Sequence, residues 1–541
     1  MKLRNLLPFV LPLTIGCSAS APIDPGPGSA AALPDRVQSA VDRGRMAPDA
    51  LVDFVVGLSV RRPEALDRFV ATRAVGDAAL APEEFADRFA PTAQEYWRVV
   101  SWLRAHGAFV TRTAAGRTTV SAYARADVVE SLFAVELHRY SDAEGDFFAA
   151  SSPLNVANEL VGTVNGVVGL SGADGWRPRL SWPDLSAGAA LAPADMEKLY
   201  GSAAIANPGM GETVAILGAG NPPDPTGDVA DFMTHYKPYG MTSAPSYTQF
   251  LLGGPTREDA SSAGGEYIEN VLDAEMVLSM APLATIVHVL VATNSPGLFT
   301  DGISYIVNNV SKAHSVSVSY GGCERGAAQE MPVMNTLFEQ AQAEGQQWFF
   351  ASGDSGTDGC RDGTGNMHIT AGWPTSSPYI VGVGGTMIGN GGIEVTWNQN
   401  ASGGGAGGGG PSEVLTKPAY QMGKTPNDNA RDTPDIAAIA GGGGVFIAVK
   451  GQHGTVGGTS AASPICAGAW ALVDQGKGGM GITDALTKMY GIGTSGAFND
   501  ITVGDNGGPD NKSPGYPAGP GYDLATGWGS PNVAQLIAHM P

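Results

Sequence analysis

The stretch GTVGGTSAASPICAG, residues 454–468, places Ser460 in a run of glycine and other small residues that leads into an apolar helical segment. The glycines allow close approach of other backbone segments, and a serine in the first helical turn has free N–H groups beside it. Such groups stabilise a developing oxyanion. The stretch therefore indicates a nucleophilic serine, although an ordinary helix-capping serine fits the same local pattern.

A serine nucleophile needs a base to take its proton. His453 is the nearest histidine, but a residue just before the turn is poorly placed to face the side chain of Ser460. The other histidines of the C-terminal part have no obvious partner motif, and we interpret them as structural: His235, His288, His314, His368 and His539.

A pair of carboxylates offers another base. Residues 264–282, GGEYIENVLDAEMVLSMAP, have apolar residues at helical spacing, and Glu269 and Asp273 lie four residues apart on one face. Two carboxylates one turn apart repel each other, which favours a shared or more tightly held proton. A solvated acidic face is the plainer interpretation, and Glu266 and Glu275 compete for any role.

The surroundings of these residues predict the fold. Short apolar runs that mostly end in Gly, Ser or Asp alternate with helical patterns such as 266–280 and 331–344. The runs are 212–220, 284–292, 314–322, 347–356 and 379–386. This alternation predicts an α/β domain with a mostly parallel sheet and helices on both faces. Ligands of such sheets bind at the carboxyl ends of the strands, where this chain has its turns.

The first third of the chain reads as a separate α+β unit. TAQEYWRVVSWLRAHG, residues 92–107, predicts a helix with a capping box made by Thr92 and Glu95. The whole chain then divides into a signal peptide (1–20), a linker (21–49), this α+β unit (50–172), a second linker (173–190) and a larger domain (191–541).

The N-terminus predicts export. Lys2 and Arg4 precede a short apolar run, and Cys17 follows a glycine as at a bacterial lipoprotein cleavage site. We expect a secreted protein, with lipid anchoring through Cys17 and ordinary cleavage nearby as the two alternatives. In an oxidising compartment, a disulfide between Cys323 and Cys360 is plausible.

Composition narrows the function classes. The formal net charge of −21 argues against a nucleic-acid partner, which needs a basic face. The hydrophobic share of 43% is enough for a sizeable core. We interpret Cys466, in the apolar segment after Ser460, as a small buried hydrophobe.

Three motifs together resemble those of the sedolisins, the serine-carboxyl peptidases: GGTSAASP around Ser460, ENVLD around Glu269, and ASGDSG around Asp354. Residues 50–172 resemble the family's pro-kumamolisin activation domain. The resemblance implies a subtilisin-like fold preceded by a smaller, ferredoxin-like prodomain. It also implies protein or peptide substrates and a chain that binds its own prodomain; we expect a monomer.

The family's catalytic roles transfer by motif. Ser460 matches the nucleophile, Glu269 its general base, Asp273 the group that orients the base, and Asp354 the oxyanion aspartate. An aspartate donates a hydrogen bond only when protonated, so such a site would be complete in acid. AILGAG lacks an acidic residue that some members use to extend the network, and Tyr320 stands where some have tryptophan.

The resemblance further implies one structural Ca²⁺ site. Its side-chain ligands match Asp500 and Asp523, and its carbonyl ligands match Ile501, Gly519 and Gly521. Carboxylates and carbonyls from glycine-rich loops are suitable Ca²⁺ ligands. Two ordinary turns are the alternative, and Asp505 and Asp510 are nearby competitors.

These observations predict an exported, acid-active serine endopeptidase made as a zymogen. A tripeptidyl aminopeptidase of the same family is the first alternative, because the sequence does not show whether a free substrate N-terminus is needed. A Ser-His-Asp peptidase using His453 and a non-catalytic surface binding protein on the same fold are the others.

Overall fold

The computed structural model describes residues 20–22, 34–173, 175–182, 189–243, 245–253, 265–361, 367–508 and 513–541. The predicted signal peptide with Cys17 is therefore almost entirely outside the described residues, as are positions 183–188 of the second linker. Within the described ranges, no helix combines the length and apolar character needed to cross a membrane.

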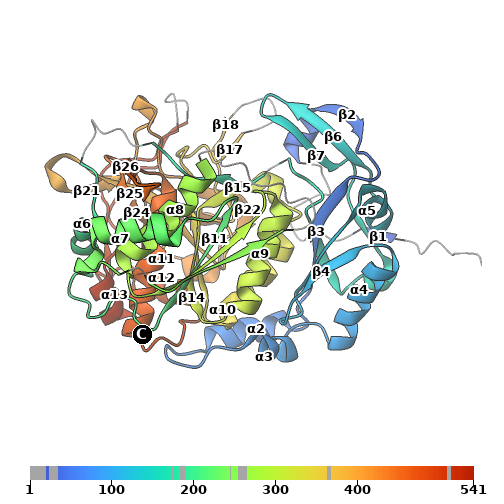
Figure 1. Cartoon of the computed structure of the whole chain (residues 1–541), viewed down its shortest axis with the longest axis horizontal. Coiled ribbons are helices and arrows are strands. Elements are labelled where there is room, and N and C mark those ends of the chain that lie inside the picture. The colour runs from blue at the N-terminus through green and yellow to red at the C-terminus, as the bar shows by residue number, and fades with distance from the viewer. Residues whose placement is uncertain are drawn as a thin grey trace, which may run out of the picture.

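An eight-stranded sheet forms the centre of the C-terminal domain (Figure 1). Its order is β12-β13-β11-β14-β16-β20-β21, and β24 also pairs with β20; every pair is parallel except β20 with β21. The strands are β11 (Thr213–Ala219), β12 (Tyr247–Leu252), β13 (Thr285–Val291), β14 (Ala313–Val318), β16 (Gln347–Ala351), β20 (Val381–Ile388), β21 (Glu394–Thr396) and β24 (Ile436–Ile439). The predicted mostly parallel sheet is confirmed, whereas β12, β21 and β24 were not predicted.

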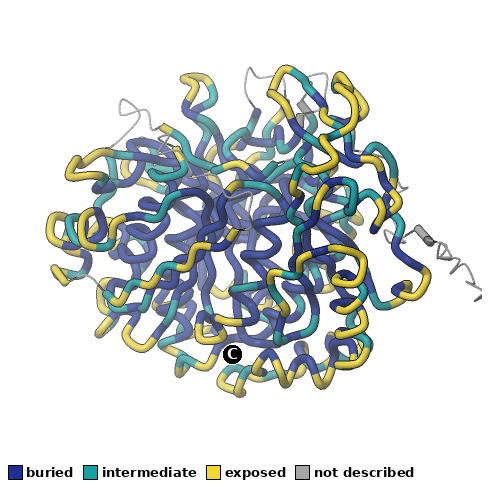
Figure 2. The backbone as a smooth tube through the Cα atoms, turned by 45° about the vertical axis from the view of Figure 1, so that its right-hand side comes forward, coloured by how far each residue is buried: buried dark blue, intermediate teal, exposed yellow. Residues whose placement is uncertain are grey.

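Helices cover both faces of this sheet because successive residues of a strand point to opposite sides. In β11, Val214 and Ile216 join one apolar cluster and Ala215 and Leu217 join the other. The first cluster includes residues of α8 (Gly265–Met280) and α11 (Thr459–Gly476); the second includes α9 (Pro296–Asn309) and α10 (Met331–Ala343). Figure 2 shows the resulting buried interior.

Smaller elements surround this framework. The further helices are α6 (Pro193–Leu199), α7 (Ala230–Tyr236), α12 (Ala485–Ile492) and α13 (Val533–His539), and two hairpins are β22 (Gly410–Thr416) with β23 (Ala430–Thr433) and β25 (Val445–Val449) with β26 (Gln452–Val456). The predicted disulfide between Cys323 and Cys360 forms, and Cys466 is a buried free thiol as expected.

The N-terminal domain has an antiparallel four-stranded sheet in the order β4-β5-β3-β9, and a second sheet in the order β2-β6-β7. Its strands are β2 (Val41–Arg45), β3 (Leu51–Leu58), β4 (Phe109–Thr113), β5 (Thr119–Arg125), β6 (Leu137–Asp142), β7 (Gly145–Ala150) and β9 (Val164–Val168). Its main helices are α2 (Pro63–Ala71), α3 (Pro82–Arg88), α4 (Ala93–Ala105) and α5 (Ala126–Phe133).

Two sequence-based expectations for this domain can be compared with the structure. Thr92 caps α4, and Thr92 and Glu95 exchange the expected capping-box hydrogen bonds. The domain begins before residue 50, within the predicted linker, because β2 pairs with β6 and Val37 is buried.

The N-terminal domain packs on the face of the C-terminal domain formed by α9 and α10 (Figure 1). Arg112 makes an ion pair with Asp301, which also accepts a hydrogen bond of 2.5 Å from Ser121. Thr118 Oγ1 donates to Gln340 Oε1 at 2.7 Å. Buried polar groups on both sides are thus paired with one another, as a stable interface requires.

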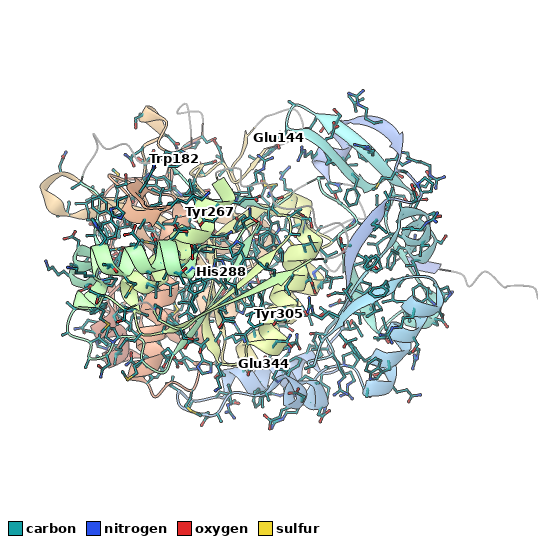
Figure 3. All side chains as sticks on the ribbon, in the orientation of Figure 1. Glu144, Trp182, Tyr267, His288, Tyr305 and Glu344 are labelled. Carbon is teal, nitrogen blue, oxygen red and sulfur yellow. A yellow bond between two sulfur atoms is a disulfide. The ribbon has the colours of Figure 1, made fainter. Side chains whose placement is uncertain are left out.

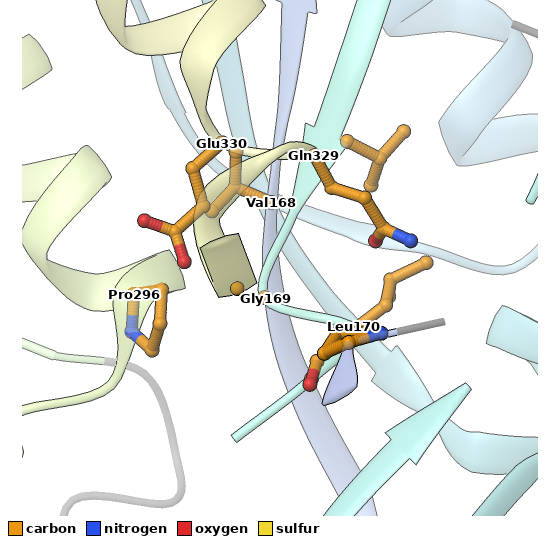
Figure 4. Close-up of a pocket in the computed structure, with 10 residues that line it drawn as sticks. Val168, Gly169, Leu170, Pro296, Gln329 and Glu330 are labelled. Atoms are coloured by element: carbon orange, nitrogen blue, oxygen red, sulfur yellow. The ribbon is translucent and has the colours of Figure 1, made fainter. Parts of the chain in front are cut away.

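At one point of this interface the two backbones touch. This point lies next to a small pocket that Gly169 lines from one domain and Pro296 from the other (Figure 4). Gly169, at the end of β9, has φ of +105°, and a Cβ on Gly297 would lie only 2.9 Å from its Cα. Because real Cβ atoms do not approach so closely, a side chain at 297 forces the domains apart.

We therefore expect Gly297→Ala to destabilise the docking of the N-terminal domain by about 1–3 kcal/mol, the usual cost of overpacking. Alanine improves helix propensity, so any loss comes from the contact. Urea unfolding of the full chain carrying Ser460→Ala measures it, with Gly172→Ala as control because its Cβ meets nothing nearer than 3.8 Å. A Gly297→Ala chain as stable as the control would contradict this close packing.

Candidate active site

Ser460 lies in the first turn of α11, next to the carboxyl ends of two sheet strands. Ser319 follows β14 and Asp354 follows β16, so both lie at the edge where parallel sheets bind ligands. Ser460 is fully buried, and its Oγ lies 3.5 Å from the carbonyl oxygen of Ser319. The helix cap before it, Gly458, has φ of +100°, a conformation that favours glycine.

Glu269 and Asp273 lie on α8, which packs directly against α11. A Cβ on Gly468 of α11 would lie 2.8–2.9 Å from atoms of Met280 and Val277, so the glycine allows the two helices to touch. Both carboxyl groups are fully buried, which excludes a solvated acidic face. The Oγ of Ser319 donates a hydrogen bond to Asp273 Oδ1 at 2.5 Å, and the same hydroxyl also interacts with the carboxyl group of Glu269.

The buried carboxyl pair holds its protons tightly. Burial, and then the charge of Asp273, raise the pKa of Glu269 well above its usual range, and the hydroxyls of Ser460 and Ser319 offset part of this rise. Burial raises the pKa of Asp273 to about 8, against the hydrogen bond from Ser319. Two interacting acids titrate as a unit, so the pair keeps at least one proton over a wide pH range.

Asp354 is held from the other side by Thr459. Its Oδ1 accepts hydrogen bonds from Thr459 N and Oγ1, both of 2.8 Å. Its Oδ2 is buried and has no hydrogen-bond partner. Burial raises the pKa of Asp354 to about 7, although Thr459 and the charge of Arg179 oppose the rise. The carboxyl group is therefore protonated in mild acid.

A segment of the second linker crosses this site. Arg177 and Pro178 form β10, which pairs antiparallel with Gly321 and Tyr320 of β15 (Tyr320–Cys323). Further along, the backbones of Ser181 and Gly457 exchange hydrogen bonds of 3.0 and 2.8 Å. The linker is thus bound as an extended strand on both sides of Ser460.

Between these two pairings, the backbone of Arg179 contacts the predicted nucleophile Ser460 and its neighbour Ser319. Its N–H donates to Ser319 O at 3.0 Å, and its carbonyl oxygen accepts from Ser460 N at 3.1 Å. A Cβ on Gly458 would lie 2.1 Å from Arg179 O and 2.5 Å from Asp354 Oδ2, so the two oxygens face the same small space. A protonated Asp354 can donate to an oxygen in this position.

The histidines are placed elsewhere. His453 Nε2 contacts Asp231 Oδ2 at 3.0 Å on an exposed part of β26. His288 lies inside the sheet (Figure 3), where Nδ1 meets Tyr247 Oη at 2.7 Å and burial lowers the pKa of the imidazole to about 3. These contacts agree with the structural interpretation of both residues.

The competing acids are also placed. Glu275 Oε2 accepts from Ala448 N at 2.9 Å, so this carboxyl group serves the contact with β25. Glu266, in the first turn of α8, lies against Gly220, where an added Cβ would be 2.7 Å from its Oε2. It thus brings an acid to the end of β11, where the sequence itself has none. Tyr320 is fully buried, and its ring is tilted against that of Phe299 with the two centroids 5.0 Å apart.

The predicted Ca²⁺ ligands lie on two adjoining loops. Gly521 N donates to Asp500 Oδ2 and Gly519 N to Asp523 Oδ2, both at 3.0 Å. Burial raises the pKa of Asp523, although hydrogen bonds from Gly519, Thr526 and Ala525 oppose the rise. Two carboxylates on glycine-rich loops are suitable ligands for a hard cation. The competitor Asp505 bonds Asn398 instead, and Asp510 is outside the described residues.

Another acidic cluster was not predicted. Glu212, His314 and Asp474 have ligand-type atoms within 4.8 Å of one another, the one such group among the described residues. His314 Nδ1 meets Asp474 Oδ2 at 2.8 Å, and burial and Asp474 raise the pKa of Glu212 to about 8. The three side chains satisfy one another as a hydrogen-bonded group.

Sequence reasoning missed two residues of the site, Ser319 and Arg179. Ser319 lies inside the predicted strand run 314–322, whereas β14 ends at Val318, so the sequence did not indicate that this serine stands at a strand end. Arg179 sits in a proline-rich segment without periodicity, and nothing local indicates that its carbonyl reaches Ser460.

The raised pKa of Asp273 makes a prediction about stability. A carboxyl group whose pKa is higher in the folded state stabilises the fold fully below its unfolded pKa of 3.8 and loses that contribution as pH rises through about 8. Asparagine mimics the protonated acid and does not titrate. In the Ser460→Ala chain, Asp273→Asn should reduce the stability loss between pH 5 and 8, by up to about 1.4 kcal/mol per pH unit.

Chemical denaturation at several pH values tests this expectation. Asp127→Asn, which changes an exposed carboxylate paired with Arg125, is the matched control and should leave the pH dependence unchanged. If Asp273→Asn and its parent lose stability equally from pH 5 to 8, the buried acid is not holding a proton.

The comparisons with known proteins agree with this geometry. The model of the Pro-kumamolisin activation domain matches residues 38–172. Kumamolisin from Bacillus sp. (strain MN-32) is 29% identical over 532 residues, covering 92% of this chain and 93% of its own length. Sedolisin from Pseudomonas sp. (strain 101) is 29% identical over 535 residues, with 93% and 89% covered.

A solved structure extends the likeness to three dimensions. Pseudomonas sedolisin, a serine-carboxyl proteinase complexed with two molecules of pseudo-iodotyrostatin, superposes with a TM-score of 0.57 at 28% identity, covering 65% of this chain and 98% of that one. The chain is therefore a serine-type peptidase of the sedolisin family, with a pro-kumamolisin activation domain at its N-terminal side.

Proposed function

We propose that this protein is an exported, acid-active endopeptidase that is made as a zymogen and cleaves peptide bonds through an acyl-enzyme on Ser460. One observation carries the proposal: a peptide carbonyl, that of Arg179, lies at the N–H of Ser460 with the carboxyl group of Asp354 beside it. The chain thus already binds a polypeptide in the way that acyl transfer requires.

The proposed chemistry follows from the protons of three acids. Ser460 attacks the peptide carbonyl while its hydroxyl proton passes to Glu269. This step needs one ionised carboxyl group in the Glu269–Asp273 pair. Glu269 then returns this proton to the leaving amine, while protonated Asp354 donates to the oxyanion. Imidazole would be fully protonated in acid, whereas a carboxyl group with an ordinary pKa of about 4 is still partly ionised there. Since burial raises the pKa values of Glu269 and Asp273 while the linker covers the site, we expect both values to fall when cleavage exposes the pair to water.

The path of the linker favours endopeptidase activity over the tripeptidyl alternative. Residues 177–179 are the three residues before the bond that follows Arg179, so a tripeptidyl peptidase would need a free N-terminus at Arg177. The chain instead continues through Trp176, whose N–H donates to Asn294 O at 3.1 Å. A cleft that holds a longer chain on this side does not need a free N-terminus at the third residue. All four side chains of the proposed mechanism are present, which argues against a non-catalytic binding protein on the same fold.

Two further features support the remaining parts of the proposal. The disulfide between Cys323 and Cys360 suits an oxidising compartment outside the cytoplasm. The loops with Asp500 and Asp523 would hold one Ca²⁺ ion, which would neutralise their charge and tie the C-terminal loops together. Recovery of the enzyme only in the cytosol would contradict export.

The central expectation is activity in acid that depends on two side chains. The matured protein should hydrolyse denatured protein fastest well below pH 7. Ser460→Ala and Glu269→Gln should each lower kcat on the order of 10³-fold or more, since each removes a group of one catalytic unit.

Glu275→Gln is the matched control because it changes a buried carboxyl of the same helix that contacts Ala448 instead of Ser460. His453→Ala should also leave activity nearly unchanged. An optimum at neutral pH, or activity that survives Ser460→Ala, would refute the proposal.

Removal of Ca²⁺ should lower thermal stability more than it lowers activity at low temperature. We expect the Tm of the Ser460→Ala chain to fall in excess chelator and to recover with added Ca²⁺, because a ligand that binds only the folded state stabilises it. Asp523→Asn should abolish this response, and Asp505→Asn should retain it. A Tm indifferent to Ca²⁺ in all three chains would exclude the site.

A further inference from the structure

The linker segment 177–181 is held in one register, and this register selects a single peptide bond. Arg177 and Pro178 pair with β15 on one side, and Ser181 pairs with Gly457 on the other. Residue 179 lies between these pairings with its N–H and its carbonyl both bonded, to Ser319 and Ser460. A shift by one residue would break all of these hydrogen bonds, because strand pairing has a fixed period.

From this register we infer that the bond between Arg179 and Leu180 is the maturation site, cleaved by Ser460 of the same chain, and that the adjoining pocket selects arginine. The inference rests on the proposed peptidase function and adds its cleavage bond and substrate preference. The N and Oγ atoms of Ser460 are three covalent bonds apart. The carbonyl oxygen that Ser460 N binds at 3.1 Å is that of Arg179, so this carbonyl group lies next to the nucleophile.

The side chain of Arg179 enters a pocket with glycine walls. Added Cβ atoms on Gly321 and Gly353 would lie 3.4 and 3.5 Å from its guanidinium nitrogens, so any side chain at either position would fill the space. The Nε atom is buried, and burial lowers the pKa of the guanidinium, although the charge of Asp354 opposes this. The site thus has room for a long, flat side chain with the carboxyl group of Asp354 near it.

The residue after the bond has its own contact. Leu180 packs against the apolar cluster that α8 and α11 share, and Trp182, two residues on, is 63% exposed (Figure 3). The preferred substrate is thus an extended peptide with arginine before the cleaved bond and an aliphatic residue after it.

The reaction consumes one water. Ser460 Oγ bonds to the carbonyl carbon of Arg179, its proton passes to Glu269, and the C–N bond breaks as Glu269 protonates the nitrogen of Leu180. Water then hydrolyses the ester, leaving a carboxyl group on Arg179, an amine on Leu180 and a free Ser460 hydroxyl. At neutral pH the Arg179 guanidinium opposes protonation of Asp354, which holds back the oxyanion donor until acid supplies the proton.

The experiment transfers the purified full chain to acid and follows it by intact mass and N-terminal sequencing. The first product should begin at Leu180, at a rate that does not change over a hundredfold dilution. The Ser460→Ala chain should stay uncut. Arg179→Gln should slow this cut by roughly tenfold or more, as expected when a pocket loses its charged group. Arg139→Gln, the same change at an exposed arginine of β6, should cut at the wild-type bond and rate.

Other results have distinct meanings. A first cut elsewhere that needs Ser460 would overturn this inference and leave the proposed function intact. A rate that rises with concentration would overturn cleavage within one chain. No cut, together with no hydrolysis of denatured protein at any pH, would overturn both. If Arg179→Gln misfolds, peptides RPRLSW and RPQLSW, given to the matured enzyme, measure the same preference: equal cleavage of the two refutes it.

Discussion

Two fully buried carboxyl groups and a third, partly buried one surround the hydroxyl of one serine and constrain the whole site. Glu269, Asp273 and Asp354 each have at least one oxygen without a hydrogen-bond partner. Three negative charges cannot be held in such a volume without cations, so protons must be retained. The proton that makes burial tolerable is also the proton that an oxyanion donor needs. The burial of the site is thus the physical reason for which we propose activity in acid.

The framework holds these acids in place through close backbone contacts. Gly468 lets α8 and α11 touch, which fixes Glu269 and Asp273 relative to Ser460. Gly458 leaves room for both Asp354 and a substrate carbonyl, and its positive φ turns the chain into α11. The parallel strands place Ser319 and Asp354 at one edge. A Cβ at either glycine would push apart groups that must meet.

The sequence could predict the elements whose signals are local. The strand runs, α8, α10 and the α4 capping box follow from periodicity and turn residues, and family motifs selected Ser460, Glu269 and Asp354. The role of Arg179 could not be predicted, because it depends on backbone pairing with residues more than a hundred positions away. For the same reason β12 and β24 were missed, and the start of the N-terminal domain was placed too late: β2 is stabilised by β6, which lies far along the chain.

The linker shows how cleavage could make activation directional. While intact, it satisfies Ser319, Ser460 and Gly457 with its own backbone, but it buries a guanidinium whose Nε has no partner. Hydrolysis at this position would add a carboxylate among three carboxyl groups and an ammonium group within an apolar cluster. Both new charges are unfavourable there and favourable in water. Cleavage would therefore weaken the binding of the linker to the cleft. Transfer of the two new charges to water would favour release of the linker and an open cleft.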